Sequence, residues 1–291
     1  MDRVYVTALA ILFFFPSNGV SGPRKLALKF SGGVSYLVVG NINRGIQGYF
    51  DYAKDMAIGL PLMPIRGDPK PIHLGFDLQG DILLNISQKM WIGLGTGYIR
   101  SGNTSEIVYD SGGGYPIKGS HKVRIGAIPI RLGISYLLLG NETFRLFLNA
   151  GAGLYFADYK YDKQPIGAGE PVLHQTANGK GFGLHGGLGG ELKLTRGMAI
   201  ILETQARYAK VGGLSGTMEY PILPRYVHVE KGPLYFWEEI VYRGHEAQFV
   251  GRYPQVYIRQ EKPSGPYVTN VRDAKIDFSG LSVMGGIKFY F

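Results

Sequence analysis

The sequence is dominated by segments in which apolar residues occupy every second position. From 73 to 84, for example, Leu74, Phe76 and Leu78 share one parity, and Asp77 and Gln79 take the other. This period of two is typical of a β-strand with one apolar face. Eight such segments are present, at 25–36, 73–84, 92–98, 127–136, 146–156, 182–193, 200–208 and 281–291. Most of them exceed the ~5–6 residues of an average strand and approach the ~9–11 residues that a membrane-spanning strand needs.

The connections between these segments alternate in length. Short turns lie at 85–89, 140–143 and 195–197, and long links lie at 42–71, 101–121, 162–180 and 211–274. Outer-membrane barrels show this alternation, with short periplasmic turns and long extracellular loops. A soluble sandwich gives no reason for loops to be sorted in this way. The pattern predicts an all-β fold: an eight-stranded antiparallel up-and-down transmembrane β-barrel, with both chain ends on the periplasmic side.

Aromatic residues mark the two ends of the apolar faces. If neighbouring segments run in opposite directions, one group falls at the outer end: Tyr36, Tyr98, Phe156, Phe182 and Tyr208. A second group falls at the periplasmic end of the same faces: Tyr136, Phe289 and Phe291. Two aromatic belts around an apolar band are typical of membrane barrels. A general preference of aromatic residues for strands does not explain why they collect at segment ends.

The last residues of the chain carry a recognisable motif. The ending 283–291, VMGGIKFYF, has apolar residues at Val283, Ile287, Phe289 and Phe291, and Gly285 departs from the alternation. It resembles the C-terminal signal of outer-membrane barrel proteins, which the barrel-assembly machinery reads. The segments 128–136 and 148–156 are similar to strands of small barrels of the OmpW/OmpX-like kind. The resemblance implies outer-membrane localisation and assembly, and it says little about a ligand because this fold hosts many functions.

The beginning of the chain looks like a targeting segment. Arg3 precedes an apolar run that ends at Pro16, and small or polar residues follow up to 22. This order is typical of a secretory signal peptide, here 1–21, which leaves 22–291 as the barrel domain. A membrane anchor is the alternative, but the run is shorter than the ~20 residues that a spanning helix needs. The absence of cysteine excludes disulfides, thiolate metal ligands and a lipoprotein anchor.

The opposite faces of the same segments would line a narrow lumen. They carry Lys25, Lys29, Gln79, Arg145 and Lys288, together with the residues of a predicted charge network: Asp77, Asp81, Arg131, Glu191, Lys193, Glu203 and Arg207. Side chains nearly fill an eight-stranded barrel, so opposite charges there should pair. We therefore expect a salt-bridged plug, with a path for protons or small solutes as the alternative. A wide pore is not expected, because such pores need ~16–18 strands.

The net charge of +9 points to anionic partners. Each outer segment end has a basic residue nearby, and the candidate contacts are Arg100, Lys122, Lys160, Lys180, Lys210 and Lys275. Lipopolysaccharide presents phosphates at this height, and lysine and arginine pair with phosphate oxygens. We expect these six residues to contact lipopolysaccharide, and chance proximity is the alternative. Nucleic acid is not an expected partner, because no basic cluster exceeds two consecutive residues.

Enzymatic chemistry has little support in the sequence. Ser120 and His121, with Glu106 in the same link, are the strongest candidates for a lipid A-modifying site. Adjacent residues on an extended chain face opposite sides, and no motif fixes a third partner. Three further histidines lack the spacing of metal ligands: His174, His228 and His245. We therefore expect no catalytic residue, no metal and no cofactor.

The long links are expected to carry the function. In the first, Ile46, Phe50, Ala53 and Ala57 have helical spacing, which predicts a short helix over the barrel mouth; ordinary loop packing is the alternative. The last link, 211–274, is too long to lack structure. Alternation at 226–230 and 255–259 indicates longer strands or an extra hairpin, with a ten-stranded barrel as the other topology. The predicted ligand or partner contacts in this link are aromatic: Tyr235, Phe236, Trp237 and Tyr242.

These features predict a monomeric, non-enzymatic protein of the outer membrane. Porin-like binding or admission of a small, hydrophobic ligand through the loop-covered mouth is the first hypothesis. A surface-adhesive or structural role is the second, and a lipid A-modifying enzyme is the third. An apolar pocket between the last link and the barrel top would favour uptake. A flat, exposed aromatic sheet would favour adhesion.

Overall fold

The computed structural model describes residues 25–58, 65–110, 116–164, 172–223, 226–243 and 248–291. The predicted signal peptide, 1–21, lies outside the described residues. The described chain forms the helix α2 (Asn41–Ile58) and the following strands: β1 (Leu26–Leu37), β2 (Ile65–Arg66), β3 (Leu74–Ser87), β4 (Met90–Asp110), β5 (Pro116–Gly140), β6 (Phe144–Gln164), β7 (Leu173–Lys193), β8 (Met198–Leu223), β9 (Tyr226–Arg243), β10 (Gln248–Ile258), β11 (Val268–Asp273), β12 (Ile276–Asp277) and β13 (Gly280–Tyr290).

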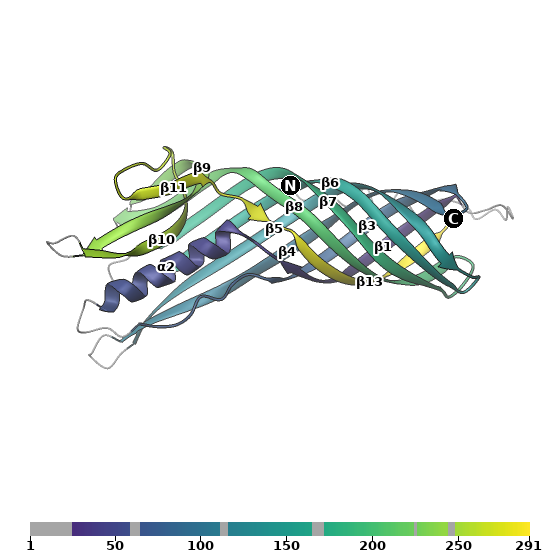
Figure 1. Cartoon of the computed structure of the whole chain (residues 1–291), viewed down its shortest axis with the longest axis horizontal. Helices are drawn as coiled ribbons and strands as arrows, with labels where there is room; N and C mark the ends of the chain where they lie inside the picture. Colours follow the sequence, from purple (N-terminus) through teal and green to yellow (C-terminus); the bar gives the residue numbers. More distant parts are fainter. Residues whose placement is uncertain (1–24, 59–64, 111–115, 165–171, 224–225, 244–247) are drawn as a thin grey trace.

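Eight of these strands close into one antiparallel ring (Figure 1). Their order around the ring is β1, β3, β4, β5, β6, β7, β8 and β13, and β13 pairs back to β1 with Tyr290 opposite Ala27. The structure confirms the predicted all-β, eight-stranded up-and-down barrel. The ten-stranded alternative is wrong, because β9 pairs with the far end of β8 and β10 pairs with β9, outside the ring.

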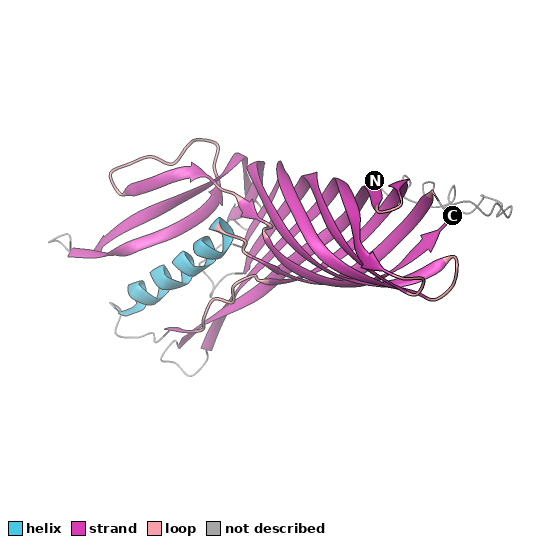
Figure 2. Ribbon diagram, turned by 45° about the vertical axis from the view of Figure 1, so that its right-hand side comes forward, coloured by secondary structure: helices cyan, strands magenta, loops and turns pink. Residues whose placement is uncertain are grey.

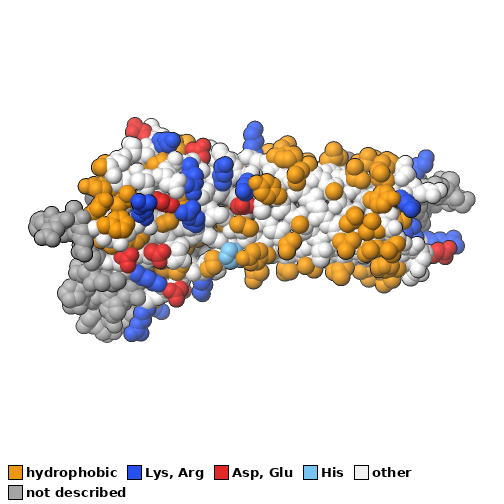
Figure 3. Space-filling model, in the orientation of Figure 1, with side chains coloured by type: hydrophobic (Ala, Val, Ile, Leu, Met, Phe, Trp, Pro, Cys, Tyr) orange, Lys and Arg blue, Asp and Glu red, His pale blue; other side chains and the backbone are white. Residues whose placement is uncertain are grey.

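The outer wall of the ring carries a wide apolar band. Outward side chains such as Leu74, Leu202 and Leu281 are exposed over more than half of their surface. Figure 3 shows hydrophobic side chains spread over the barrel wall, with most charged side chains toward the end that carries α2. Water would penalise such a surface, whereas lipid chains would cover it. β1 and β13, with 12 and 11 residues, have the length that crosses this band.

Five strands continue well beyond the band. β4, β5, β6, β7 and β8 contain 21 to 26 residues each. The expectation of loops at 101–121 and 162–180 is therefore corrected, since strands occupy much of both links. In the last link, 211–274, the prediction of longer strands or an extra hairpin is confirmed, because β8 extends to Leu223 and β9 pairs with β10. The reason for the correction is a reversal of apolar parity along each strand. On β4, the exposed outward Leu94 is followed by the fully buried inward Ile99 and Ile107. A prediction that follows the apolar residues on one parity therefore ends the strand where the apolar face changes from the outside of the barrel to the inside.

Beyond the band, the helix and a second sheet lie beside the ends of the five long strands (Figure 2). β9 pairs with the end of β8, and β10 and β11 flank β9. α2 packs closely against β10, because a Cβ atom at Gly48 would lie 2.1 Å from the carbonyl oxygen of Pro254. The predicted helix over the barrel mouth is confirmed. We call α2, β9–β11 and the far ends of β4–β8 the distal lobe.

The interior of the distal lobe is a hydrophobic core. Ile42, Ile46 and Phe50 of α2 belong to one cluster of buried side chains with Phe236 of β9 and Phe278. This packing, rather than helix propensity, stabilises the helix at its place in the mouth. In the described part of the chain, no helix is both long and apolar enough to cross a membrane.

Candidate functional sites in the lumen and the distal lobe

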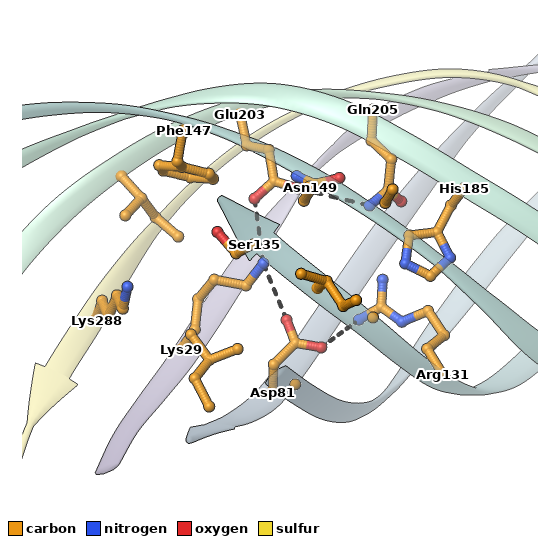
Figure 4. Close-up of a pocket in the computed structure, with 16 residues that line it drawn as sticks. Lys29, Asp81, Arg131, Ser135, Phe147, Asn149, His185, Glu203, Gln205 and Lys288 are labelled. Carbon is orange, nitrogen blue, oxygen red and sulfur yellow. Dashed lines mark hydrogen bonds and ion pairs between the residues drawn. The ribbon is translucent and has the colours of Figure 1, made fainter. Parts of the chain in front are cut away.

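A charge network fills the middle of the lumen (Figure 4). The Lys29 ammonium lies 3.0 Å from Asp81 and 3.1 Å from Glu203. Arg131 donates to the other oxygen of Asp81 over 2.9 Å. β4 leaves room for Asp81 at Gly95, where a Cβ atom would lie 1.8 Å from the carboxylate. The opposite charges are paired because an unpaired charge in a narrow lumen is costly. The cavity around Lys29 measures about 50 Å³, enough for a few water molecules.

A second ion pair lies toward the distal lobe. Arg207 donates to Asp77 over 2.7 Å, and both side chains are almost fully buried. The Gln79 amide connects this pair to the middle of the lumen, with 3.2 Å to Asp77 and 3.3 Å to Gln205. The inward side chains beyond it are apolar and buried: Ile99, Ala127, Ala209 and Phe278. They join the core of the distal lobe, so apolar packing fills the barrel at this level.

The remaining network residues lie at the opposite end of the lumen. Lys288 donates to Glu191 over 3.2 Å, and the Tyr290 hydroxyl donates to the same carboxylate. Arg145 lies 3.9 Å from Glu191, and Lys193 lines the lumen beside them. The structure thus places every predicted network residue in the lumen. Alternation along the strands predicted this placement but not the pairs, which depend on register across the barrel.

Ser120, His121 and Glu106 do not form a catalytic group. Ser120 lies opposite Glu106 on the outer side of β4 and β5. His121 points into the distal lobe, is 2% exposed, and has its Nδ1 atom 2.7 Å from the Tyr161 hydroxyl. Burial, with a smaller effect of Lys163, lowers the pKa of His121 to about 3. Among the described residues, no group of three or more histidines and acids is placed to hold a metal ion.

Two of the four predicted aromatic contacts in the last link are buried. Phe236 is fully buried, and the guanidinium groups of Arg44 and Arg272 lie 4.9 and 4.1 Å from its ring centre. Trp237 is 6% exposed and Tyr235 is half-buried. The prediction that Phe236 and Trp237 meet a ligand or partner is therefore corrected. Burial of Phe236 in the core of the distal lobe holds β9 to the rest of the molecule, whereas the ring of Trp237 contacts Tyr257 on β10.

Tyr242, the fourth predicted contact, is exposed and has two aromatic neighbours. Its ring centre lies 6.0 Å from that of Phe249 and 5.4 Å from that of Tyr267. The three side chains are 44–56% exposed. We call them the aromatic cluster. Sequence reasoning missed Phe249 and Tyr267, because their proximity to Tyr242 follows from the pairing of β9 with β10 and the path into β11.

The six predicted lipopolysaccharide contacts all lie exposed at or beyond the edge of the band: Arg100, Lys122, Lys160, Lys180, Lys210 and Lys275. Arg100 and Lys122 share an open groove of about 760 Å³ with Lys70 and Arg124. Leu74 and Phe76 form its apolar rim. We call this the basic groove. Cations beside an apolar rim have the chemistry that a lipid with a phosphorylated headgroup requires.

The C-terminal motif alternates on β13 as its pattern predicts. Val283, Ile287 and Phe291 are exposed on the lipid side, and Phe289 is half-buried there. Met284, Lys288 and Tyr290 take the lumen side. Recognition of this ending by the assembly machinery stays a prediction.

Neither protein-family models nor curated proteins give a match to the chain. Two solved structures are similar to it over most of its length. The outer membrane protein OprG from Pseudomonas aeruginosa has a TM-score of 0.38 and 12% identity, and the outer membrane protease OmpT from Escherichia coli has 0.34 and 11%. Each comparison covers 94% of this chain and 99% of the other. Scores this low carry no argument, so the architecture of a small outer-membrane barrel rests on the closed strand ring and its apolar band.

Proposed function

We propose that the protein is a monomeric, non-enzymatic outer-membrane barrel that closes its own lumen and displays the distal lobe at the cell surface to bind a partner. The observation that carries this proposal is the aromatic cluster on the outside of a lobe whose interior is packed. Three neighbouring rings in water are unfavourable without a partner. Aromatic side chains are enriched at protein interfaces. The partner that fits is a protein surface with an apolar patch.

In this proposal the distal lobe is extracellular and both chain ends are periplasmic. β13 ends beside the start of β1, at the end of the barrel where the turns are short. Short periplasmic turns and long extracellular segments are the usual arrangement of such barrels. The basic groove supports lipopolysaccharide as the lipid partner, since its cations lie at the edge of the apolar band. The outward ending of β13 supports insertion by the barrel-assembly machinery.

Admission of a small ligand through the mouth has less support. The cavity between α2, β6 and β10 measures about 20 Å³, which is space for a single water molecule rather than for a ligand. Below it, apolar side chains and ion pairs occupy the lumen. A lipid A-modifying activity lacks its candidate group, because His121 and Ser120 face opposite sides of β5.

Cells that display the full-length chain provide the test. Combining Tyr242→Ser with Phe249→Ser should lower attachment to protein-coated surfaces several-fold, because interface aromatics dominate such contacts. Tyr226→Ser is the matched control, since Tyr226 is exposed but lies outside the cluster. Proteolysis of intact cells shows whether all variants are displayed equally. Unchanged attachment of the double variant would contradict the proposal, and stable ion conductance of the purified barrel in a planar bilayer would favour uptake instead.

A further inference from the structure

The edge strands of the distal lobe differ in how they are protected. An edge strand presents backbone N–H and C=O groups that lack a partner strand on one side, and another chain can pair with them. Proteins usually block such edges with a covering segment, a proline, a bulge or a very short strand.

The edges of β10, β11 and β4 are blocked in these ways. α2 lies along β10 (Figure 1), where a Cβ atom at Gly48 would lie 2.1 Å from the carbonyl oxygen of Pro254, and this proline has no N–H to donate. β11 is short, its pairing with β9 is irregular, and Asn270 has a positive φ of 55°. β2 pairs with the far end of β4, and the backbone N–H of Lys70 donates to the Ser105 hydroxyl beside it.

The first half of β9 has an edge without such protection. Residues 226–233 pair with β8 on one side. On the other side β10 pairs only from Leu234 onward, and in the described part of the chain no strand pairs there with Val227–Val229. The Pro233 carbonyl oxygen accepts from the Arg259 N–H on this other side. Backbone groups alternate between the two sides of a strand, so Val227 and Val229 also turn their N–H and C=O groups to it.

We call Val227–Val229 the open edge. Its two valine side chains are 53% and 46% exposed. The open edge contains no proline and no lysine, and the bulge nearby lies on β8, between Pro221 and Leu223. Exposed β-branched residues on a regular strand favour the addition of a further strand.

We propose that the open edge binds an extended segment of a partner protein, which joins the sheet as a further antiparallel strand. Backbone hydrogen bonds supply the affinity in this mode of recognition, and alternate side chains supply the specificity. β-Branched residues in the partner strand would suit the sheet.

Charges beside the open edge specify one position of the partner strand. Glu219 lies opposite Val229 on β8 and is exposed on the same outer face. A lysine opposite Val229 would cover this valine with its stem and extend its ammonium toward Glu219. Lys231 is the next exposed residue on that face and would repel a second cation placed opposite it. The partner segment therefore combines β-branched residues with one basic residue.

A second copy of the chain does not fit the open edge. Antiparallel pairing of the edge with itself relates the copies by a two-fold axis perpendicular to the sheet. Such an axis inverts one barrel relative to the other, whereas barrels in one membrane share their orientation. The occupant is therefore a different chain. The inference goes beyond the proposed function, because the aromatic cluster lies at the other end of β9.

A short labelled peptide with the order threonine, valine, lysine, valine, threonine, valine is the probe. It is titrated with the full-length protein in detergent micelles, and fluorescence anisotropy is measured. We expect saturable binding. With lysine opposite Val229, the amides of lysine and of the second threonine face β9, so their N-methylation should abolish binding. N-methylation of the first two valines is the matched control, because their amides face away from β9.

Val229→Pro tests the protein side. Proline removes the N–H on the open side and leaves the pairing with β8 intact, so the Kd should rise at least about tenfold. Val229→Thr is the matched control, since it keeps the β-branched shape and the N–H, and its Kd should stay within about twofold. Glu219→Gln should raise the Kd about two- to fivefold, because one exposed ion pair is lost. Heat-modifiability reports the folding of each variant.

Four outcomes would overturn the proposal. They are the absence of saturable binding, equal binding of the two methylated peptides, an unchanged Kd in Val229→Pro, and dimers of the unmodified chain in sedimentation that Val229→Pro abolishes. The last outcome would assign the open edge to a second copy. The surface role of the aromatic cluster is tested separately, since it depends on the side chains of Tyr242 and Phe249 and not on the open edge.

Discussion

At the scale of single residues, His121 couples the packing of the distal lobe to pH. Burial first, and Lys163 second, lower its pKa from 6.5 to about 3. Between these two values the unfolded chain binds a proton that the folded chain does not. The contribution of neutral His121 to the free energy of unfolding is therefore complete above about pH 6.5. It decreases as the pH falls toward 3, by up to about 1.4 kcal/mol per pH unit.

Urea unfolding of the lobe, followed by Trp237 fluorescence in a Trp91→Phe background, should show this slope. Trp237 is a suitable reporter because it is buried in the lobe. In His121→Phe the slope from this site should disappear. Absolute stability will also change, since the hydrogen bond between His121 and Tyr161 is lost, so the pH dependence is the quantity to compare. Equal slopes with and without the histidine would show that His121 titrates normally in the folded lobe.

At the scale of elements, α2 approaches β10 so closely at Gly48 that no side chain fits between them. A Cβ atom at Gly48 would meet both the nitrogen and the carbonyl oxygen of Pro254, at 2.6 and 2.1 Å. Backbone atoms cannot rotate away, so Gly48→Ala should separate the helix from the strand. We expect a cost of about 1–3 kcal/mol for this overpacking, although alanine favours an isolated helix by about 1 kcal/mol.

Limited proteolysis of α2 in the folded barrel measures this effect. Gln47→Ala is the control, because Gln47 is the exposed neighbour and its substitution leaves the contact unchanged. Cleavage should accelerate in Gly48→Ala and not in Gln47→Ala. Slower cleavage in Gly48→Ala would mean that helix propensity outweighs the contact and that α2 does not press on β10.

The basic groove gives a second prediction at the scale of elements. Combining Arg100→Gln with Lys122→Gln removes two of its cations and leaves the apolar rim in place. The lipopolysaccharide-dependent rise in the melting temperature of the purified barrel should become smaller, because charge-assisted contacts with phosphate are lost. The rise in the unmodified protein should also shrink with added salt, which screens exposed charges. Arg196→Gln, at the opposite end, should keep the full effect; an equal reduction there would assign the effect to net charge alone.

How far the elements could be predicted depends on where they lie. Within the band each strand alternates on one parity, so the sequence reveals the eight strands and their lipid side. α2 follows from the helical spacing of Ile46, Phe50 and Ala53. The alternation at 226–230 and 255–259 also reveals the hairpin of β9 and β10. The extensions of β4 and β6 into the distal lobe do not follow, because Ile107 and Tyr159 continue these strands on the opposite parity. The ion pairs and the aromatic cluster both depend on register between strands, which alternation within one strand does not contain.

At the scale of the whole molecule, the reversal of apolar parity divides one continuous barrel into a part that is suited to lipid and a part that is suited to water. In the band, apolar side chains face outward to lipid and charged groups pair inside. In the distal lobe, the same strands turn apolar side chains inward and basic ones outward. The distal lobe is therefore packed like a water-soluble domain, with an apolar core and a polar surface, although its strands continue from the membrane-spanning part of the barrel. A charge introduced on the surface of the distal lobe should therefore change the free energy of unfolding little, as on a soluble protein. A charge introduced on the outside of the band should lower it strongly, because that surface faces lipid.

β8 allows this to be tested within one strand. Leu202 and Ser215 are both exposed, but Leu202 lies in the band and Ser215 lies in the distal lobe. Leu202→Arg should lower the free energy of unfolding in lipid vesicles by about 2–4 kcal/mol, because the charge must enter the apolar part of the bilayer. Ser215→Arg should change it by less than about 0.5 kcal/mol, as is usual for a water-exposed site. Urea titrations of the two variants in the same vesicles give both values. Similar values for the two would mean that the boundary between lipid and water does not lie where the parity reverses.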